Sequence, residues 1–565
     1  MGDNPAMSLP LELHRFDALM KLTRERYGKP TAAEAQVLRF SASTDASDPI
    51  DLKDRRPIRG DFLSWLAADK EAANQIDPLG IRVYNAAIAS NLALDYSKIS
   101  FPLNFHFCTF TQDVFVQYAQ LASVSLSHCT IQSIRAEGVT VAGSIYLKSS
   151  VVHGEMNLNG AHIGLNLGCF GVRLTGSGDV LHVSNAKIGG DIILLDGFSS
   201  AGTIWLLETQ VDGELSCSGA QMTKSGTALL LDSSEIGTVF FDKGFSSEGA
   251  ISLIGTNIRG DLNCHGARQF AELRCDKLQV GKRMVYLDIE SPATANLLLF
   301  SASIGALHDD EKSWPQKNSL NLEGFVYQQL VSHERATADE IKTDEFGDSL
   351  KLDVEKRIEW LRLQPDDYLD NAQPWMQLAK LLEATGDIEG SKHVVYEYHR
   401  WRARASVWRP FTFFYDQAVE QPLRVAFPIA LFWGIGSLVF WRAHRMGAMK
   451  SAAKASKDDG DGRAVTPAAP IPFNPVVYTL ENVLPVVKLG QDEAWAPDPK
   501  ASEGTWLPEW KWLAPVKNWA EKWNLTRWAI RLNYPRLALL RWTLILVGWA
   551  LALVLGAAIG EQFKR

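Results

Sequence analysis

A short phrase that returns along the chain limits the fold more than any other feature. It reads "VVHGEMNLNGAHI" at 151–163, "QVDGELSCSGAQM" at 210–222 and "NIRGDLNCHGARQ" at 257–269. In the first copy Met156 and Leu158 alternate with polar residues, which is the period of a half-buried strand, and the neighbouring glycines mark turns. Many strand-and-turn phrases in series predict a solenoid.

The length of the repeat predicts the kind of solenoid. The last apolar residue of each phrase serves as an anchor, and most steps between anchors are 10 or 11 residues, stretching to 13 or 14 where a loop is longer. Two steps, roughly 21 to 25 residues, would close one coil of a right-handed parallel β-helix, with about eight coils in residues 81–275 and a length on the order of 40 Å. The anchors are Ile88, Ile99, Phe110, Leu121, Ile131, Val141, Val152, Ile163, Leu174, Ile188, Phe198, Val211, Met222, Ile236, Phe245 and Ile258.

Charge and cysteine content narrow the function class. The 565 residues carry a net charge of −8 without basic runs, so the chain lacks the footprint of a nucleic-acid-binding protein. Five of the six cysteines (108, 129, 169, 217 and 264) fall at repeated positions of the solenoid, Cys275 has no clear phase, and no CxxC spacing occurs. We expect small buried apolar residues rather than metal or redox ligands.

The residues before the repeat are expected to be helical. Residues 1–80 place Val37, Phe40, Phe62 and Leu66 between polar turns, and no signal peptide is apparent. An N-terminal helical cap would cover the first coil, because the end of a solenoid exposes unpaired strand edges. The β-helix domain is assigned to residues 81–310.

Residues 311–415 are predicted to form a helical adaptor. In "NAQPWMQLAKLLEATGDIEGSKHVVYEYHRWRAR" (371–404), Pro374 suits a first helical turn and Gly386 a helix end. The helical hairpin is similar to one tetratricopeptide unit. A structural adaptor and a peptide-binding groove both remain open.

Residues 416–565 are predicted to be a membrane domain. The uncharged runs 425–441 and 542–560 have the length of transmembrane helices, and Arg424 and Arg442 flank the first. Without a signal peptide the β-helix is expected in the cytoplasm, with both chain ends on that side of a bacterial inner membrane. A buried core helix is the alternative for the shorter run.

The segment between the two runs contains three parts. Residues 449–470 have the composition of a flexible linker, and residues 471–490 are apolar but broken by prolines. Residues 506–530 place apolar residues on one helical face, which predicts an interfacial amphipathic helix. That face consists of Trp512, Val516, Trp519, Trp523 and Ile530. The whole order also fits a channel subunit with a pore loop, although no selectivity filter is present.

The chain resembles a family of bacterial membrane-anchored β-helical repeat proteins, similar to pentapeptide-repeat proteins and often labelled membrane-associated oxidoreductases. The resemblance rests on "IRGDFLSWLAADK" (58–70), "FPLNFHFCTF" (101–110), the repeat phrases, "LEGFVYQQL" (322–330), "QPWMQLAKLLEATGD" (373–387), "YTLENVLPVVKLGQDEAWAP" (478–497) and "VGWALA" (547–552). It implies β-helical repeats followed by a helical adaptor and C-terminal membrane segments. It supplies no catalytic residues.

Enzymatic chemistry finds little support in the residues. The closest match to a dinucleotide-binding loop, Gly176 to Leu181, lacks the third glycine and lies in a solenoid loop. Asp191, Glu214 and Asp261 share a repeat position and could pair for acid–base work, although solvated turn residues would show the same pattern. His265 beside Cys264 belongs to no metal motif.

The sequence thus predicts a membrane-anchored β-helical scaffold, with no assigned catalytic, cofactor-binding or metal-binding residue and no cofactor. Its expected partners are the lipid bilayer, a protein bound to one face of the β-helix, and a second copy of the chain through small residues such as Gly434, Gly436, Gly548 and Gly556. The alternatives are a membrane effector or channel acting through the C-terminal region and, third, an enzyme.

Overall fold

The fold is that of a computed structural model. It describes residues 9–43, 56–332, 352–402, 422–451, 471–484, 488–500, 504–505, 531–532 and 534–562. The chain divides into a first unit, residues 1–398, and a second unit, residues 399–565. Each is described by itself.

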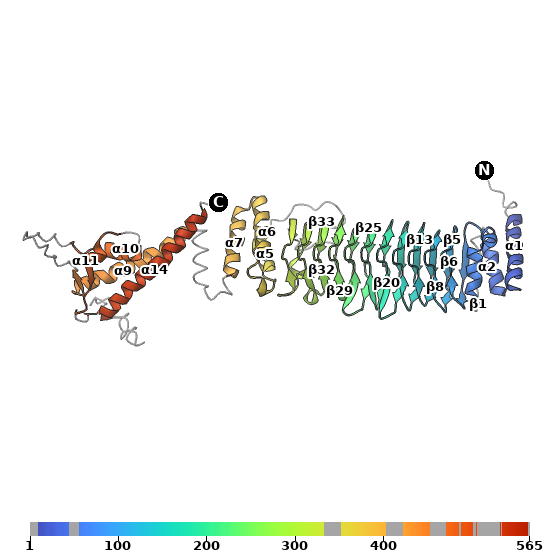
Figure 1. The fold of residues 1–565 in the computed structure, drawn as a ribbon, viewed down its shortest axis with the longest axis horizontal. Helices are drawn as coiled ribbons and strands as arrows, with labels where there is room; N and C mark the ends of the chain where they lie inside the picture. Colours follow the sequence, from blue (N-terminus) through green and yellow to red (C-terminus); the bar gives the residue numbers. More distant parts are fainter. Residues whose placement is uncertain are drawn as a thin grey trace, which may run out of the picture. The chain divides into compact units, whose positions relative to one another are not determined.

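The first unit is a β-solenoid of about 11 turns, with helices at both ends (Figure 1). All pairings between its strands are parallel, and they form two sheets along the stack. One sheet contains β1 (Arg56–Ile58), β3 (Ala86–Ile88), β4 (Leu92–Ala93), β7 (Thr109–Phe110), β8 (Val114–Phe115), β11 (Thr130–Ile131), β12 (Ile134–Arg135), β15 (Val151–Val152), β16 (Met156–Asn157), β19 (Arg173–Leu174), β20 (Asp179–His182), β23 (Ser199–Ser200), β24 (Thr203–Trp205), β26 (Gln221–Met222), β27 (Thr227–Leu230), β29 (Ser246–Ser252), β32 (Gln269–Arg274), β34 (Asn296–Leu298) and β36 (Leu320–Asn321).

The second sheet completes each coil. It contains β2 (Ile81–Tyr84), β5 (Lys98–Ile99), β6 (Leu103–His106), β9 (Gln120–Leu121), β10 (Val124–Ser127), β13 (Thr140–Val141), β14 (Ile145–Lys148), β17 (His162–Ile163), β18 (Leu167–Phe170), β21 (Lys187–Ile188), β22 (Ile192–Ile193), β25 (Gln210–Ser216), β28 (Glu235–Phe240), β30 (Asn257–Ile258), β31 (Leu262–Asn263), β33 (Gln279–Tyr286), β35 (Ser303–Asp309) and β37 (Val326–Ser332). The strands therefore continue to Ser332, past the predicted boundary at residue 310. The right-handed winding stays a prediction.

The anchors stack as the two-step coil requires. Ile99 pairs with Leu121, which pairs with Val141, and the same row continues through Ile163 and Ile188. All five side chains are buried, because alternate residues of each strand point into the coil. Along this row the interior is thus built from one apolar side chain per coil.

Two predicted anchors, Phe198 and Phe245, are out of register. Leu174 and Met222 pair with Ser200, and Met222 pairs on its other side with Ser247. Both serines can occupy inner positions because their hydroxyls donate to the carbonyl oxygens two residues ahead, at 2.8 Å. The phenylalanines lie two residues earlier and are themselves buried.

All six cysteines lie buried in the solenoid as free thiols, as predicted. Burial raises the pKa of Cys169 to about 12 and that of Cys217 in the same direction. Cys275, which had no phase in the repeat, is also fully enclosed. Such thiols act as small apolar residues.

Helices α1 (Leu9–Tyr27), α2 (Ala32–Ala42), α3 (Gly60–Ala68) and α4 (Lys70–Ala73) lie before the first coil (Figure 1). Helix α2 begins with a capping box between Thr31 and Glu34. The Arg82 side chain on β2 donates to the backbone oxygens of Phe40 and Ser43, both at 2.7 Å. The side chains of Phe40 and Phe62 are buried, so these helices do cover the coil end.

The far end of the solenoid is closed by α5 (Val354–Leu361) and α6 (Gln373–Ala384), which is followed by α7 (Ile388–Arg402). The Gln373 side chain donates to the Phe325 oxygen at 2.9 Å and accepts from the Gly324 N–H at 2.9 Å. Four residues on, Gln377 donates to the Tyr327 oxygen at 2.8 Å. Helix α6 of the predicted helical adaptor therefore binds the backbone of the last coil, where a further strand would otherwise pair.

Three short 3₁₀ turns also occur in the described part of the first unit. They are η1 (Pro292–Thr294), η2 (Glu311–Ser313) and η3 (Asp366–Tyr368).

The second unit is mainly helical. It contains α9 (Pro422–Arg445), α10 (Pro475–Val483), α11 (Gln491–Ala494), α14 (Tyr534–Gln562) and the short strands β38 (Met449–Ser451), β39 (Trp495–Pro497), β40 (Gly504–Thr505) and β41 (Arg531–Leu532). Phe440, Tyr478 and Leu544, from α9, α10 and α14, share a buried core. A Cβ on Gly548 would collide with the Val483 carbonyl oxygen, so α10 and α14 pack closely there.

The predicted transmembrane helices are wrong. The runs 425–441 and 542–560 fall within α9 and α14, but no helix in the described part of the chain is long and apolar enough to cross a bilayer. Part of the apolar surface of the two runs is used in the core around Phe440 and Leu544, which is the core-helix alternative. The predicted multi-pass inner-membrane location is wrong for the same reason, whereas the bilayer as a partner stays a prediction.

Other predictions for this region meet different outcomes. Of the linker predicted at 449–470, residues 449–451 form β38 instead, and the rest lies outside the described residues, as does the tryptophan-rich face at 506–530. Of the glycines expected at close helix contacts, Gly436 and Gly548 do pack against neighbours, whereas a Cβ added to Gly434 would meet no atom within 4 Å.

Candidate functional site

The acidic row predicted from the repeat is part of the backbone framework. Asp191 accepts a hydrogen bond from the Glu214 N–H at 2.9 Å, one coil away. Asp261 accepts from the Arg283 N–H at 2.9 Å and pairs with its guanidinium at 2.7 Å. Burial, and then the charge of Asp191, raises the pKa of Glu214. Asp191 and Asp261 each bind the backbone of the next coil. This structural role explains why acidic residues recur at the position, without any acid–base chemistry.

Two other sequence candidates separate in the structure. Cys264 is buried inside the coil, whereas His265 lies outside with its Nε2 3.1 Å from Asp288. No group of three or more metal-ligating side chains occurs in the described ranges. In the glycine-rich stretch 176–181, the Gly178 oxygen accepts from the Thr203 N–H and Leu181 points into the core, so a strand rather than a helix follows the glycines.

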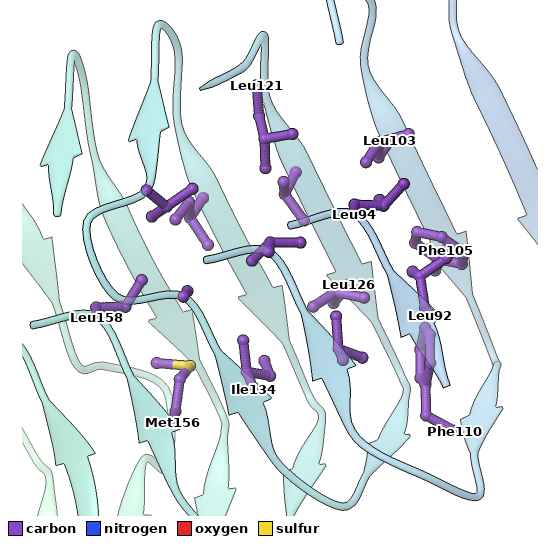
Figure 2. A pocket seen from close by; sticks show the side chains of 16 residues that line it. Leu92, Leu94, Leu103, Phe105, Phe110, Leu121, Leu126, Ile134, Met156 and Leu158 are labelled. Atoms are coloured by element: carbon purple, nitrogen blue, oxygen red, sulfur yellow. The ribbon is translucent and has the colours of Figure 1, made fainter. Parts of the chain in front are cut away.

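The cavity inside the early coils of the solenoid is small and apolar. It has a volume of ≈ 40 Å³ and lies between leucine, isoleucine, valine, alanine, phenylalanine and methionine side chains (Figure 2). Leu126, Ile134 and Met156 are among the residues that face it in the close view. An apolar cavity of this size stays dry and is a packing feature.

An open groove of ≈ 930 Å³ lies where the N-terminal helices meet the first coil. Arg59 on its wall binds the fully buried Glu34 carboxylate through two hydrogen bonds, at 2.8 and 3.1 Å. Burial alone would raise the pKa of Glu34, but the bonds from Arg59 and Thr31 outweigh it and lower the pKa. The Tyr27 ring lies 4.8 Å from the Arg59 guanidinium. Since Glu34 neutralises Arg59, this pair holds the N-terminal helices together rather than offering Arg59 to an anion.

A connected group of polar side chains on the outer surface lies on β20, on β24 and at Glu155, the residue before β16. His182 and Trp205 are register neighbours, and their rings stack 5.8 Å apart at an interplanar angle of 4°. The Trp205 indole donates to Asp179 at 2.9 Å, and His182 Nε2 lies 3.8 Å from Glu155 and 3.9 Å from Asp179. We call Glu155, Asp179, His182 and Trp205 the loop face.

Two longer loops border the loop face. They precede β20 and β27, in coils that alternate with tighter ones, and the Lys224 ammonium donates to the Ser177 oxygen at 2.7 Å to join them. In the tight coil between them a Cβ on Gly202 would collide with the Gly178 carbonyl oxygen. The loop between β19 and β20 therefore lies directly against the next coil, and this contact holds the loop in place beside the loop face.

Sequence reasoning missed this cluster. Asp179 and His182 are three positions apart, but Glu155 lies 24 positions before Asp179 and Trp205 lies 23 after His182, so only coil stacking brings the four together. The available signal was the lengthened repeat steps, which predict extra loop residues near 175–180 and 199–203; the structure has a longer loop before β20, but 199–203 holds β23, β24 and a tight turn.

The geometry suits recognition better than catalysis. The Nε2 atom of His182 lies within ion-pair distance of each carboxylate, but both distances exceed the 3.5 Å of a hydrogen bond. Neither carboxylate therefore orients the ring as a general base requires. Asp179 is 52% exposed and Glu155 36%, so their charges face solvent. The loop face presents two acids and an aromatic pair in fixed positions.

Comparisons of the chain with protein-family models, with curated proteins and with solved structures gave no match in any of the three. The resemblance to membrane-anchored β-helical repeat proteins therefore stays a prediction, and the fold itself places the chain among β-solenoids.

Proposed function

We propose that this protein is a scaffold whose β-solenoid binds a protein partner through the loop face. The observation that carries the proposal is the network among Asp179, His182 and Trp205, which holds these side chains to one another at the surface. Side chains fixed before binding lose little conformational freedom when a partner docks. Tryptophan is also among the residues that contribute most at protein interfaces.

The closed ends of the solenoid support this role. At the first coil Arg82 binds the end of α2, and at the last coil Gln373 and Gln377 occupy the strand edge. An exposed edge would pair with other strands and promote aggregation. With both ends closed, the sides of the rod are the surface that remains for specific binding.

An enzyme is less well supported. The thiols are buried, the acidic row binds the backbone, and the loop-face histidine lacks a hydrogen-bonded carboxylate. The oxidoreductase label that the resemblance carries finds no site among the described residues.

The test compares two charge reversals of similar exposure. Asp179→Lys changes the loop face, whereas Glu235→Lys changes an exposed acid of the other sheet, on β28. Each chain would be used for proximity labelling in intact cells, with thermal unfolding as a check on folding. We expect at least one protein labelled by the wild type and by Glu235→Lys to drop by tenfold or more with Asp179→Lys. Equal labelling by the three chains would contradict the proposal.

A further inference from the structure

Helix α14 exposes a continuous apolar stripe. Leu539 is 67% exposed, Trp542 63%, Leu546 68% and Trp549 51%. Single exposed apolar side chains are normal on a protein surface, whereas contiguous ones mark interaction sites. The four residues, called here the α14 stripe, lie outside the core of the second unit.

The opposite side of the same helix is already in use. Leu537 and Leu544 are 1% exposed and belong to the core with Tyr478, while Gly548 packs against Val483. The helix is therefore held in place by its inner side. The α14 stripe projects from a fixed support, so ordering it on binding costs little.

The spacing of the stripe fits another helix. Its residues are separated by three, four and three positions, the a and d spacing of a coiled coil. Knobs at these positions insert between the corresponding residues of a partner helix, and an identical helix has the required holes. The stripe contains no charged residue, so two copies would meet without repulsion.

The area is sufficient for a specific dimer. With an aromatic side chain covering about 150–250 Å² in full, the exposed parts of the four side chains sum to roughly 500 Å². Two copies would bury on the order of 1,000 Å², the lower limit for a stable interface. A two-fold axis lets the same stripe serve both partners.

We propose that two copies of this chain associate through the α14 stripe, helix against helix. The proposal is independent of the partner on the loop face, because the stripe lies in the second unit. It would make the scaffold bivalent.

Sedimentation equilibrium of the full chain gives the first test. The wild type is expected at twice the chain mass of 62.6 kDa, and Leu546→Glu at the single mass, with dimerisation weakened at least tenfold. Ile435→Glu is the matched control, since Ile435 on α9 is an apolar residue that is 50% exposed but lies off the stripe. A monomeric wild type, or an equal loss of dimer with Ile435→Glu, would overturn the proposal.

Cross-linking gives a second test that does not depend on a disruptive charge. All six native cysteines are buried, so an added surface thiol is the reactive one. An equal mixture of Trp542→Cys and Leu546→Cys chains covers both directions of helix pairing, and oxidation should link about half of the dimers, namely those in which the two thiols face each other. Tyr534→Cys, exposed on the same helix but about 100° from the stripe, should stay unlinked. Linking of all the variants to the same extent would contradict a defined seam.

Discussion

At the residue scale, a few buried charges fix the ends of the solenoid. Arg357 on α5 is fully buried and donates to Asp309 on β35 at 2.7 Å. Burial alone would lower the pKa of Arg357, but the Asp309 charge and hydrogen bonds outweigh it and raise the pKa. The pair ties the C-terminal cap to the second-last strand of its sheet.

Asp309→Ala should destabilise the first unit by about 3–5 kcal/mol, because it leaves the Arg357 charge buried without its partner. Chemical denaturation would measure the change. Glu272→Ala, which removes the partner of the half-exposed Arg274, should cost less than about 1 kcal/mol. Similar losses for the two variants would show that Asp309 does not hold the cap.

His106 should make stability depend on pH. Burial, and then the charge of His128, lowers the pKa of His106, whose ring also stacks on Tyr84 at 5.0 Å. The folded state therefore prefers neutral His106. Its contribution is complete above the unfolded-state pKa of about 6.5 and is lost as pH falls below that value. Urea midpoints at pH 7.5 and 5.0 should differ less in His106→Asn than in the wild type; an unchanged difference would reject this assignment.

At the element scale, glycine permits the close stacking of loops. Gly202→Ala should destabilise the chain by about 1–3 kcal/mol, since the new Cβ would collide with the carbonyl oxygen of Gly178. Gly178→Ala is the matched control, because no atom lies within 4 Å of its Cβ position. Thermal unfolding of the two variants should differ clearly, and equal unfolding temperatures would place the tight contact elsewhere.

The glutamines of α6 should protect the last coil. With both Gln373 and Gln377 changed to Ala, the backbone oxygens of Phe325 and Tyr327 lose their partners, at about 1–3 kcal/mol for each buried group. Hydrogen exchange of β37 should speed up in this variant. Gln120→Ala, an exposed residue on β9, should leave exchange in β37 unchanged. Equal exchange in all three chains would mean that α6 is not the end cap.

At the scale of the whole molecule, the spacing of apolar residues predicted the solenoid but not which side chains of separate coils come into contact. Ile99, Leu121 and Val141 could be predicted as core residues because they occupy the same inner position in successive coils. Ser200 could not be recognised as an inner residue, since its hydroxyl is satisfied by a loop that only the fold defines. His182 and Trp205 meet through stacking of separate coils.

The C-terminal helices show a different limit. Apolar length alone does not distinguish a helix that spans a bilayer from one that packs in a core. The run at 542–560 has Leu544 in the core with Phe440, while Leu546 of the same turn is exposed. Which of the two leucines is buried depends on which elements pack against α14, and the sequence of the helix alone does not give this.

The scaffold proposal is tested most directly by a hydrogen-exchange footprint. The full chain would be compared alone and in complex with the protein whose labelling depends on Asp179. We expect slower exchange in the loops before β20 and β27 and in β24, with β28 and β30 on the other sheet unchanged. Protection confined to the other sheet, or none in the solenoid, would contradict binding at the loop face.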